Sequence, residues 1–264
     1  MKRAFLARST VAAIALLVAL ASSSALVGSA QAAITQVGAT KQWYLRDFNS
    51  SGVPNASFTY GLPGDIPIVG DWNGDGFDTA GVVRGNTWFL RNSNSTGVAN
   101  LTFSYGIPGD IPIVGDWNGD GIDTPGVVRG NIWYLRNSNS GGIANLTFSY
   151  GLLSDIKIVG DWNGDGIDTP GVVRGYNWFL RNSNSTGVAN VAYSYGVPSD
   201  TKIVGDWDAN GSDTPGVVRG NAWYLRNANS TGVANLAFYF GNATDIKLVG
   251  DWNGDGIDTS GLAR

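Results

Sequence analysis

The sequence predicts an all-β fold, a β-propeller with five blades of four antiparallel strands, on the strength of three observations. First, all ten tryptophans fall into two series in which neighbours are 45 residues apart. Second, each 45-residue unit contains four short runs rich in β-branched and aromatic residues. Third, no segment beyond the first 33 residues has the period of a helix. Four strands in about 45 residues are typical of one propeller blade. The two series are Trp43, Trp88, Trp133, Trp178 and Trp223, and Trp72, Trp117, Trp162, Trp207 and Trp252.

The expected strands are clearest in the second unit, where they are Thr87–Arg91, Asn100–Tyr105, Ile111–Trp117 and Thr124–Arg129. Clusters of Gly, Asn, Ser, Asp and Pro separate them. In Trp133-Tyr134-Leu135, large side chains alternate between the two faces, so the sheet needs neighbours on both sides. A closed ring supplies them. The alternative, an open β-solenoid, would leave two apolar end faces without a capping unit.

The phase of the repeat predicts how the ring closes. The first tryptophan strand lies near residue 43, and the last expected strand is Thr259–Ala263. If each blade runs from the IVGDW strand on the inside to the FSYG strand on the outside, four blades are continuous. The fifth then takes its two inner strands from residues 245–264 and its two outer strands from residues 40–61.

Residues 1–33 have the pattern of a cleaved signal peptide. Lys2, Arg3 and Arg8 precede the apolar run Val11–Leu20, and Ala30-Gln31-Ala32 is a cleavage pattern. The apolar run is shorter than the roughly 20 residues that a membrane-spanning helix needs, and no other run of that length follows. We therefore expect a secreted protein without a membrane span, in which residues 34–264 form one domain.

The composition excludes several classes of function. The chain has no His and no Cys, which removes the usual zinc and copper ligands and the imidazole base. Taking Lys2, Arg3 and Arg8 from the 17 basic residues leaves 14 against 21 acidic ones. This excess of negative charge argues against nucleic acid as a partner, because phosphate binding needs clustered Lys and Arg.

An Asp-rich loop recurs in every unit between the third and fourth expected strands. In the first copy, oxygen-bearing side chains stand at loop positions 1, 3, 5 and 8, with Gly76 at position 6 for the turn. Oxygen ligands at alternate positions, with a backbone carbonyl at position 7, suit calcium better than transition metals or magnesium. The alternative is a loop whose Asx turns satisfy its own backbone amides.

The candidate calcium ligands recur in all five copies, and in the fourth copy Asn and Asp exchange positions 3 and 5. They are Asp71, Asn73, Asp75 and Asp78; Asp116, Asn118, Asp120 and Asp123; Asp161, Asn163, Asp165 and Asp168; Asp206, Asp208, Asn210 and Asp213; and Asp251, Asn253, Asp255 and Asp258. With up to five Ca²⁺ bound, we expect calcium to be mainly structural.

The pattern Gly-Asp-x-Asn-Gly-Asp-Gly-x-Asp, followed by a strand such as Gly-Val-Val-Arg, resembles the FG-GAP/VCBS-type repeats. The resemblance covers residues 34–264. It implies a propeller in which calcium loops join the two innermost strands of each blade, as in the integrin α-subunit head. Two features depart from that family. The last carboxylate stands at position 8 rather than 9, where Thr79 lies, and there are five copies rather than seven.

Two sets of arginines recur, one after the WYLR-type strands and one after the GVVR strands. They could bind anions, but we expect them to pair with the loop aspartates and to pack on tryptophan faces. Asn/Ser/Gly-rich loops, such as Asn92–Asn100, Asn137–Asn145 and Asn182–Asn190, would gather at one end of the ring. Amides beside Trp and Tyr suit neutral sugars, although any hairpin loop uses such residues.

These features favour a secreted calcium-binding propeller that acts as a binding or adhesion module for an extracellular glycan or protein. The alternative is a carbohydrate-binding lectin with up to five equivalent sites. An enzyme is disfavoured, because near-identical repeats do not provide the heterogeneous set of groups that catalysis needs. We therefore expect no catalytic residues.

Overall fold

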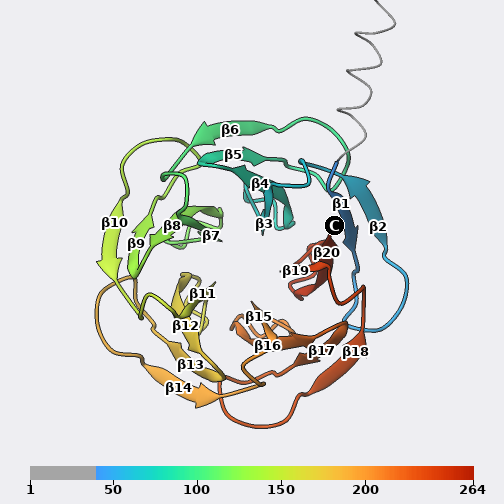
Figure 1. Ribbon diagram of the computed structural model, residues 1–264, viewed down its shortest axis with the longest axis vertical. Helices are drawn as coiled ribbons and strands as arrows, with labels where there is room; N and C mark the ends of the chain where they lie inside the picture. Colours follow the sequence, from blue (N-terminus) through green and yellow to red (C-terminus); the bar gives the residue numbers. More distant parts are fainter. Residues whose placement is uncertain (1–39) are drawn as a thin grey trace, which may run out of the picture. The chain divides into compact units, whose positions relative to one another are not determined.

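The computed structural model describes residues 40–264, so the predicted signal peptide lies outside the described residues. Within residues 40–264, all regular structure is β-strand, and five four-stranded antiparallel sheets surround a central channel (Figure 1). The prediction of a five-bladed propeller is confirmed. No helix in this part of the chain has the length and apolar character needed to cross a bilayer.

Four of the five sheets run outward from the axis in chain order. The first complete blade contains β3 (Ile66–Gly70), β4 (Thr79–Arg84), β5 (Thr87–Leu90) and β6 (Leu101–Ser104). The next three contain β7 (Ile111–Gly115), β8 (Thr124–Arg129), β9 (Ile132–Leu135) and β10 (Leu146–Ser149); β11 (Ile156–Gly160), β12 (Thr169–Arg174), β13 (Asn177–Leu180) and β14 (Val191–Ser194); and β15 (Thr201–Gly205), β16 (Thr214–Arg219), β17 (Ala222–Leu225) and β18 (Leu236–Tyr239). In the second unit, the observed strands β5 to β8 match the expected strands to within two residues at each end.

The fifth blade joins the two ends of the described chain. It contains β19 (Ile246–Gly250) and β20 (Thr259–Ala263) on the inside and β1 (Gln42–Leu45) and β2 (Ala56–Thr59) on the outside. Strands β20 and β1 pair in antiparallel register, and the backbones of Gln42 and Arg264 exchange hydrogen bonds of 3.0 and 2.9 Å. The predicted two-plus-two closure is confirmed.

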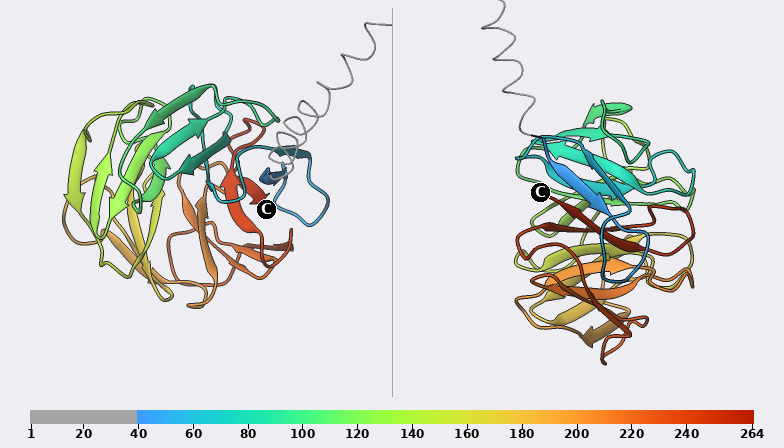
Figure 2. Two further views of the ribbon diagram at one scale, coloured as in Figure 1. Left: turned by 45° about the horizontal axis from the view of Figure 1, so that its top comes forward. Right: turned by 90° about the vertical axis from the view of Figure 1, so that its right-hand side faces the viewer.

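The second strand of each blade is the most deeply buried, because blades pack against both of its faces. In β4, every residue from Thr79 to Val83 is buried, and only Arg84 is exposed. Gly81 is required at its position, since a Cβ there would lie 2.9 Å from Ile68 and 3.0 Å from the ring of Trp72. The two inner strands and the loop between them therefore pack tightly within each blade, and Figure 2 shows the blades from two further directions.

The core is built from one repeated aromatic pair per blade. Trp43 is completely buried and stacks on Phe58, with ring centroids 5.9 Å apart. Its indole N–H donates to the carbonyl oxygen of Tyr60 at 2.9 Å, so that the polar end of the ring is satisfied. The other four blades repeat this arrangement at Trp88, Trp133, Trp178 and Trp223.

Candidate functional site

The five Asp-rich loops connect the two inner strands of each blade, and the aspartate at position 1 fastens its own loop. Asp71 Oδ1 accepts a hydrogen bond from the N–H of Gly74 at 2.8 Å, and Oδ2 accepts one from Gly76 at 2.7 Å. The N–H groups of Asn73 and Asp75 also point at Oδ1, at 3.3 and 3.2 Å. This is the arrangement of an Asx turn, in which a side chain takes the place of a backbone acceptor.

The side chains at positions 3 and 5 lie together on the exposed side of the loop. Asn73 Nδ2 donates to Asp75 Oδ2 at 2.8 Å, and Asp75 Oδ1 accepts from the N–H of Phe77 at 3.1 Å. The equivalent pairs are Asn118–Asp120, Asn163–Asp165 and Asn253–Asp255. Positions 1, 3 and 5 are therefore brought together in each of these loops.

The fourth copy keeps the turn with different contacts. Asp206 Oδ2 still accepts from the N–H of Gly211 at 2.7 Å. The exchanged residue Asp208 accepts a hydrogen bond from Asn227 Nδ2 at 2.9 Å, which ties this loop to the outer part of its own blade. Ala209 adopts φ = 56° at the position where the other four loops have glycine. That left-handed conformation is costly for a residue with a side chain.

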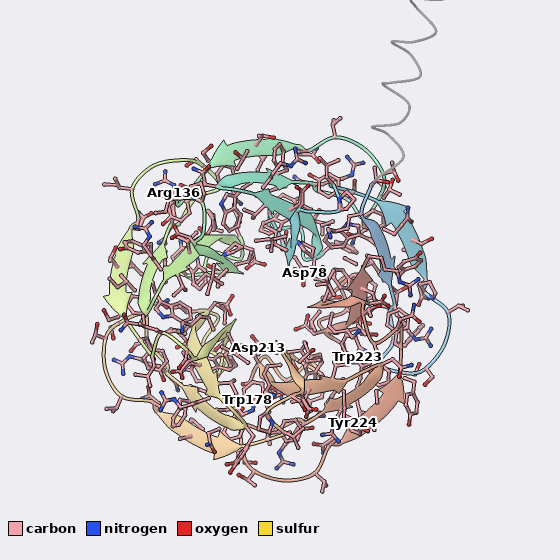
Figure 3. All side chains as sticks on the ribbon, in the orientation of Figure 1. Asp78, Arg136, Trp178, Asp213, Trp223 and Tyr224 are labelled. Atoms are coloured by element: carbon pink, nitrogen blue, oxygen red, sulfur yellow. The ribbon has the colours of Figure 1, made fainter. Side chains whose placement is uncertain are left out.

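The aspartate at position 8 does not join its own loop but reaches the neighbouring blade. Asp78 Oδ2 accepts from the N–H of Asp251 at 2.8 Å, and the Asp78 N–H donates to the Asp251 carbonyl oxygen at 2.8 Å. The same two-point contact recurs at every blade junction. The five residues are Asp78, Asp123, Asp168, Asp213 and Asp258, and they line a cavity of ≈170 Å³ in the channel (Figure 3).

Burial in this ring disfavours the ionised carboxylates. Desolvation raises the pKa of Asp78 and of Asp168 to about 7. Neighbouring carboxylates add to this shift, and the hydrogen bond from the next blade opposes it. Burial also raises the pKa of Asp123, Asp213 and Asp258 well above the ordinary aspartate value of 3.8. The ring therefore tends to keep protons at pH values where exposed aspartates lose them.

The structure brings together part of each predicted calcium set. The donors at positions 1, 3 and 5 share a loop, and their oxygen chemistry fits calcium. The carboxylate at position 8 lies across a blade junction, and within residues 40–264 no three Asp side chains form a group spaced to hold a metal. Asp71, Asn73 and Asp75 therefore share a turn that Asp78 does not join, and calcium binding by these loops stays a prediction.

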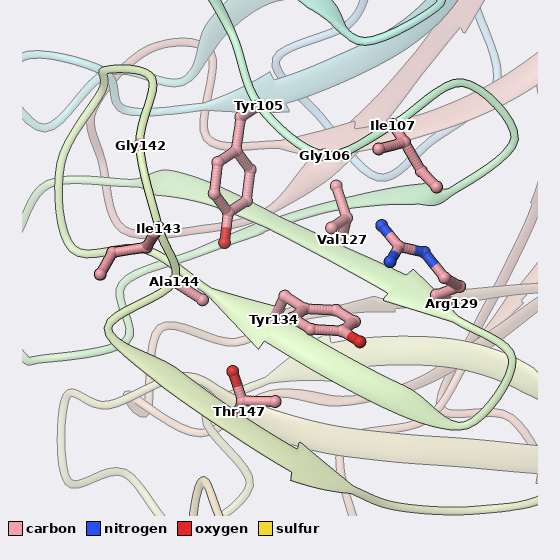
Figure 4. A pocket seen from close by; sticks show the side chains of 10 residues that line it. All are labelled: Tyr105, Gly106, Ile107, Val127, Arg129, Tyr134, Gly142, Ile143, Ala144 and Thr147. Atoms are coloured by element: carbon pink, nitrogen blue, oxygen red, sulfur yellow. The ribbon is translucent and has the colours of Figure 1, made fainter.

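A second kind of site, which the sequence did not reveal, lies between neighbouring blades. One such cavity, of ≈390 Å³, has Tyr105, Gly106 and Ile107 of one blade on one side. Val127, Arg129, Tyr134, Gly142, Ile143, Ala144 and Thr147 of the next blade line the other side (Figure 4). Equivalent residues line cavities of ≈250 Å³ beside Tyr195 and ≈210 Å³ beside Tyr150. We call these the inter-blade pockets.

An arginine held by an aspartate forms one side of each pocket. Arg129 donates from Nε and Nη2 to the two carboxylate oxygens of Asp110, at 2.8 and 2.9 Å. Its guanidinium lies 5.1 Å from the ring centroid of Tyr134. The hydrogen bond from Arg129 lowers the pKa of Asp110, although burial opposes the shift, so the pair stays ionised. All five blades repeat this ion pair: Arg84–Asp65, Arg129–Asp110, Arg174–Asp155, Arg219–Asp200 and Arg264–Asp245.

These contacts correct the expected arginine partners. The GVVR arginines pair with an aspartate just before the inner strand, not with the Asp-rich loop, and stack on Phe or Tyr rather than on Trp. The arginines of the WYLR strands hold the outer loops instead. Arg91, for example, donates to the carbonyl oxygens of Ser95 and Val98 at 2.6 and 2.7 Å. Their side chains are therefore used in building the loop.

An exposed aliphatic side chain from the outer loop lines two of these pockets. Val233 lines the ≈250 Å³ pocket, and Ile143, whose exposed fraction is 88%, lines the ≈390 Å³ pocket. The equivalents of Ile143, all at least 79% exposed, are Val53, Val98, Val188 and Val233. The asparagines of these loops hold the loop itself: Asn100 Oδ1 accepts from the Asn92 N–H, and Asn94 Nδ2 donates to the Asp78 carbonyl oxygen, while Asn94 Oδ1 is buried without a partner. No asparagine lines the three inter-blade pockets.

No protein-family model matches the chain, and no curated protein is similar to it. Among solved structures, the chain is similar to a lectin of Agrocybe aegerita that recognises non-reducing terminal N-acetylglucosamine. The sequence identity is 11%, the TM-score is 0.47, and the alignment covers 84% of this chain and 83% of the lectin. A likeness at this level carries no argument about a ligand, and the resemblance to FG-GAP/VCBS-type repeats stays a prediction.

Two repeated sequence features mark the residues of the inter-blade pockets, although neither was interpreted in that way from the sequence. A Tyr-Gly dipeptide ends the outer strand in four repeats, as at Tyr105-Gly106, and Phe240-Gly241 replaces it in the fifth. An aliphatic residue recurs in each outer loop at a position where a hairpin needs only polar residues. Such an exposed apolar residue in every repeat is informative, because it has no role in the core of its own blade.

Proposed function

We propose that the protein is a multivalent carbohydrate-binding module that takes neutral sugars in its inter-blade pockets. The observation that carries this proposal is the repeated pocket that combines an apolar floor, aromatic edges and one charge-compensated arginine. The cavity of ≈390 Å³ lies at the small end of the range for ligand pockets, about 300–1,000 Å³, and those of ≈250 and ≈210 Å³ lie just below it. That size suits one or two sugar rings rather than a protein segment.

The charge of the pocket supports a neutral ligand. Asp110 compensates Arg129, and the guanidinium keeps one nitrogen, Nη1, without a hydrogen-bond partner among residues 40–264. An N–H group of this kind donates readily to a hydroxyl oxygen. A carboxylate or phosphate ligand would have to compete with Asp110 for the same guanidinium.

The apolar part of the pocket supports a ligand with both polar and apolar surfaces. Val127 forms the floor, while Tyr105 and Tyr134 come from the two facing blades. A sugar ring has C–H faces that pack on such side chains and hydroxyl edges that accept from N–H donors. The two properties of the pocket are therefore matched by one ligand class.

Binding rather than catalysis is supported by the repetition of the pocket. The acidic group beside each pocket, such as Asp110, is already engaged by arginine and is poorly placed to act as a general acid or base. Several copies of one weak site raise the strength of attachment to a repetitive glycan surface through effective concentration. The N-terminal sequence pattern supports an extracellular location for this activity.

Calcium is proposed as a structural ion in the Asp-rich loops rather than as part of the sugar site. Asp71, Asn73 and Asp75, with their equivalents, would hold it, and when bound it would neutralise the exposed carboxylates of the loop. No residue of the Asp-rich loops lines the three inter-blade pockets. A calcium effect on sugar binding would therefore act through the stability of the ring.

A glycan array with the full chain, followed by calorimetric titration of the best ligand, tests the proposed function. We expect saturable binding of a neutral glycan with several sites per chain. Replacing the five exposed residues of the pocket edge with Asp, as in I143D and its four equivalents, should weaken binding at least about tenfold, because a charge must then be desolvated by the ligand. These side chains are exposed, so folding should persist.

The matched control places the same five Asp residues at exposed positions outside the pockets, namely Ile66, Ile111, Ile156, Thr201 and Ile246. This variant should bind as the natural protein does. Absence of saturable binding to every neutral glycan, or equal binding by both five-Asp variants, would refute the proposed function.

A further inference from the structure

A hydroxyl group ties the outer loop of one blade to the outer strand of the preceding blade at four of the five junctions. Thr96 Oγ1 accepts from the Thr59 N–H at 3.1 Å, and Thr186 accepts from Ser149 at the same distance. The remaining two ties join Thr231 Oγ1 to the Ser194 N–H and Ser51 Oγ to the Tyr239 N–H. We call this hydrogen bond the loop tie.

The fifth junction lacks the loop tie, because glycine occupies the hydroxyl position. Gly141 stands where the other outer loops have Thr or Ser. Gly141 therefore offers no hydroxyl to the N–H of Ser104, the residue at the end of β6 that corresponds to the tied Thr59, Ser149, Ser194 and Tyr239. A Cβ on Gly141 would lie 2.8 Å from the Ser104 carbonyl oxygen, so the loop runs closer to the strand than a residue with a side chain permits.

The surroundings of Ser104 also differ from those at the other junctions. Phe103 is only partly buried, whereas its equivalents Phe58, Phe148, Tyr193 and Phe238 are all buried. The adjoining inter-blade pocket, at ≈390 Å³, is larger than the ≈250 and ≈210 Å³ of two equivalents that keep the tie. A missing loop tie, a less buried aromatic side chain and a larger cavity therefore occur at the same junction.

The hydroxyl of Tyr105 is an independent indication that this junction differs from the others. Tyr105 is 95% buried, since its exposed fraction is 5%, and it extends into this pocket (Figure 4). Its hydroxyl oxygen is buried without a hydrogen-bond partner. By contrast, the hydroxyls of Tyr150 and Tyr195 donate to backbone carbonyl oxygens of the next blade at 3.1 Å. The Tyr60 hydroxyl is also without a partner, but at a junction that keeps its tie.

We propose that the inter-blade pockets are unequal, and that the pocket of Tyr105, Arg129 and Ile143 is the primary ligand site. It takes a neutral sugar whose hydroxyl oxygens accept from Arg129 Nη1 and the Tyr105 hydroxyl, while a C–H face packs on Ile143. This inference deepens the proposed function and rests on it. An unpaired donor gains more from a ligand than one that must first give up an internal bond.

The test is amide NMR of the ¹⁵N-labelled full chain, titrated separately with two kinds of probe. The sugars are the methyl β-glycosides of glucose and galactose, and the non-sugar probe is 2-propanol, which needs only a donor and an apolar surface. We expect the amides of Ser104 and Gly141 to respond first, at concentrations about fivefold lower than the amides of the other junctions, as one additional hydrogen bond would give.

Two variants test whether the missing loop tie causes the difference between the pockets, one by restoring a tie and one by removing a tie. Gly141→Thr restores the loop tie and should bring this pocket to the affinity of the others, after a small outward shift of the loop. Thr186→Gly removes the tie at the next junction and should make the pocket beside Tyr150 a second early responder. Thr186→Ser keeps a hydroxyl and should leave the order of responses unchanged. Thr186→Gly creates no steric clash, so the test stands even if Gly141→Thr fails to fold.

Each outcome decides between the two proposals. Equal responses at all five junctions, or a first response elsewhere, would overturn the primary site even if sugars bind. A response to 2-propanol at Ser104 and Gly141 without any response to either sugar would keep the primary site and count against the sugar-binding function. No response to any probe at this junction would overturn the primary site, and the glycan array would decide the function separately.

Discussion

The aspartate that precedes each inner strand is an example of burial balanced by a single partner. The Asp155 side chain is fully buried, while that of its partner Arg174 is about half exposed, at 49%. Asp155 also accepts from the Leu152 N–H at 2.8 Å, which anchors the connection between the blades. Burial alone would raise the pKa of Asp155, but the hydrogen bonds from Arg174 and Leu152 outweigh it, and the pKa is lowered.

Asp155→Asn should destabilise the protein by about 1–2 kcal/mol at neutral pH, because a charge-assisted pair is lost but its arginine remains half solvated. Since the folded-state pKa of Asp155 is depressed, the pair stabilises the fold above the unfolded value of 3.8 and this contribution disappears as the pH falls through the folded value. Denaturant unfolding of both proteins across this range is the measurement. A difference that persists unchanged in acid would contradict the assignment.

The partner of Arg174 could in principle have been predicted from the strand register. Ile156 pairs with Val173 in the β11–β12 hairpin, so the next pair outward is Asp155 with Arg174. The residue pattern alone did not distinguish this aspartate from the three in the nearby loop. The proximity of Tyr105 and Arg129 could not be predicted from strand register. The two residues come from different blades, and only the packing of the blades brings them together.

The Asp-rich loop shows how far a local motif determines its own structure. The alternating spacing predicts that positions 1, 3 and 5 share one turn, and in the structure Asp71, Asn73 and Asp75 do. Position 8 differs because β4 begins at Thr79, so Asp78 lies at the strand entrance beside the axis. Its partner, Asp251, is 173 residues away in the sequence, and no local pattern specifies that contact.

Calcium should raise the thermal midpoint of the protein if the loops bind it. A site with a dissociation constant near 0.1 mM contributes roughly 1.4 kcal/mol at about 1 mM calcium. Asp75→Asn should remove one such increment and leave the midpoint in chelator almost unchanged, because Asp75 accepts only one backbone hydrogen bond. Asp71→Asn, in contrast, should lower the midpoint in chelator as well, since Asp71 fastens the turn itself.

Thermal melts of the natural protein and both variants, with calcium and with chelator, provide the comparison. An identical midpoint of the natural protein under both conditions would refute a structural role for calcium. The position-8 residues give a further contrast, because Asp78 and its equivalents support blade contacts and should matter in chelator too.

At the scale of the whole molecule, the repeat made the architecture predictable. Five units of equal length, two apolar faces per strand and the phase of the first and last units led to the ring and to its closure by β19, β20, β1 and β2. The inter-blade pockets were not predictable in this way. Their volume depends on how neighbouring blades pack, and it differs between junctions whose sequences are nearly the same.

The closure can be tested by moving the ends of the chain. Arg264 and Gln42 face each other as Arg84 and Thr87 do, and those two are joined by the turn Gly85-Asn86. One glycine inserted between Arg264 and Lys41 should therefore reproduce this turn. A permuted chain that starts at Gly130 and ends at Arg129 should fold and unfold cooperatively, because it opens an equivalent turn.

Deletion of residues 259–264 is the matched counterpart. It removes β20, whose residues are all buried, and leaves β1 and β19 without the strand between them. This chain should lose its cooperative unfolding transition in calorimetry and expose apolar surface to a dye. A cooperative transition near that of the natural protein would show that the shared blade is dispensable.

The shared blade also sets an order of events during synthesis. Strands β1 and β2 are made before every other described strand, yet their sheet partners are made last. Trp43 and Phe58 must therefore remain uncovered while the ribosome produces four complete blades, which can fold as they emerge. Throughout that interval, the nascent chain exposes the unpaired edge of the β1–β2 hairpin. Rapid translation or a chaperone is then needed to keep this hairpin from pairing with another chain.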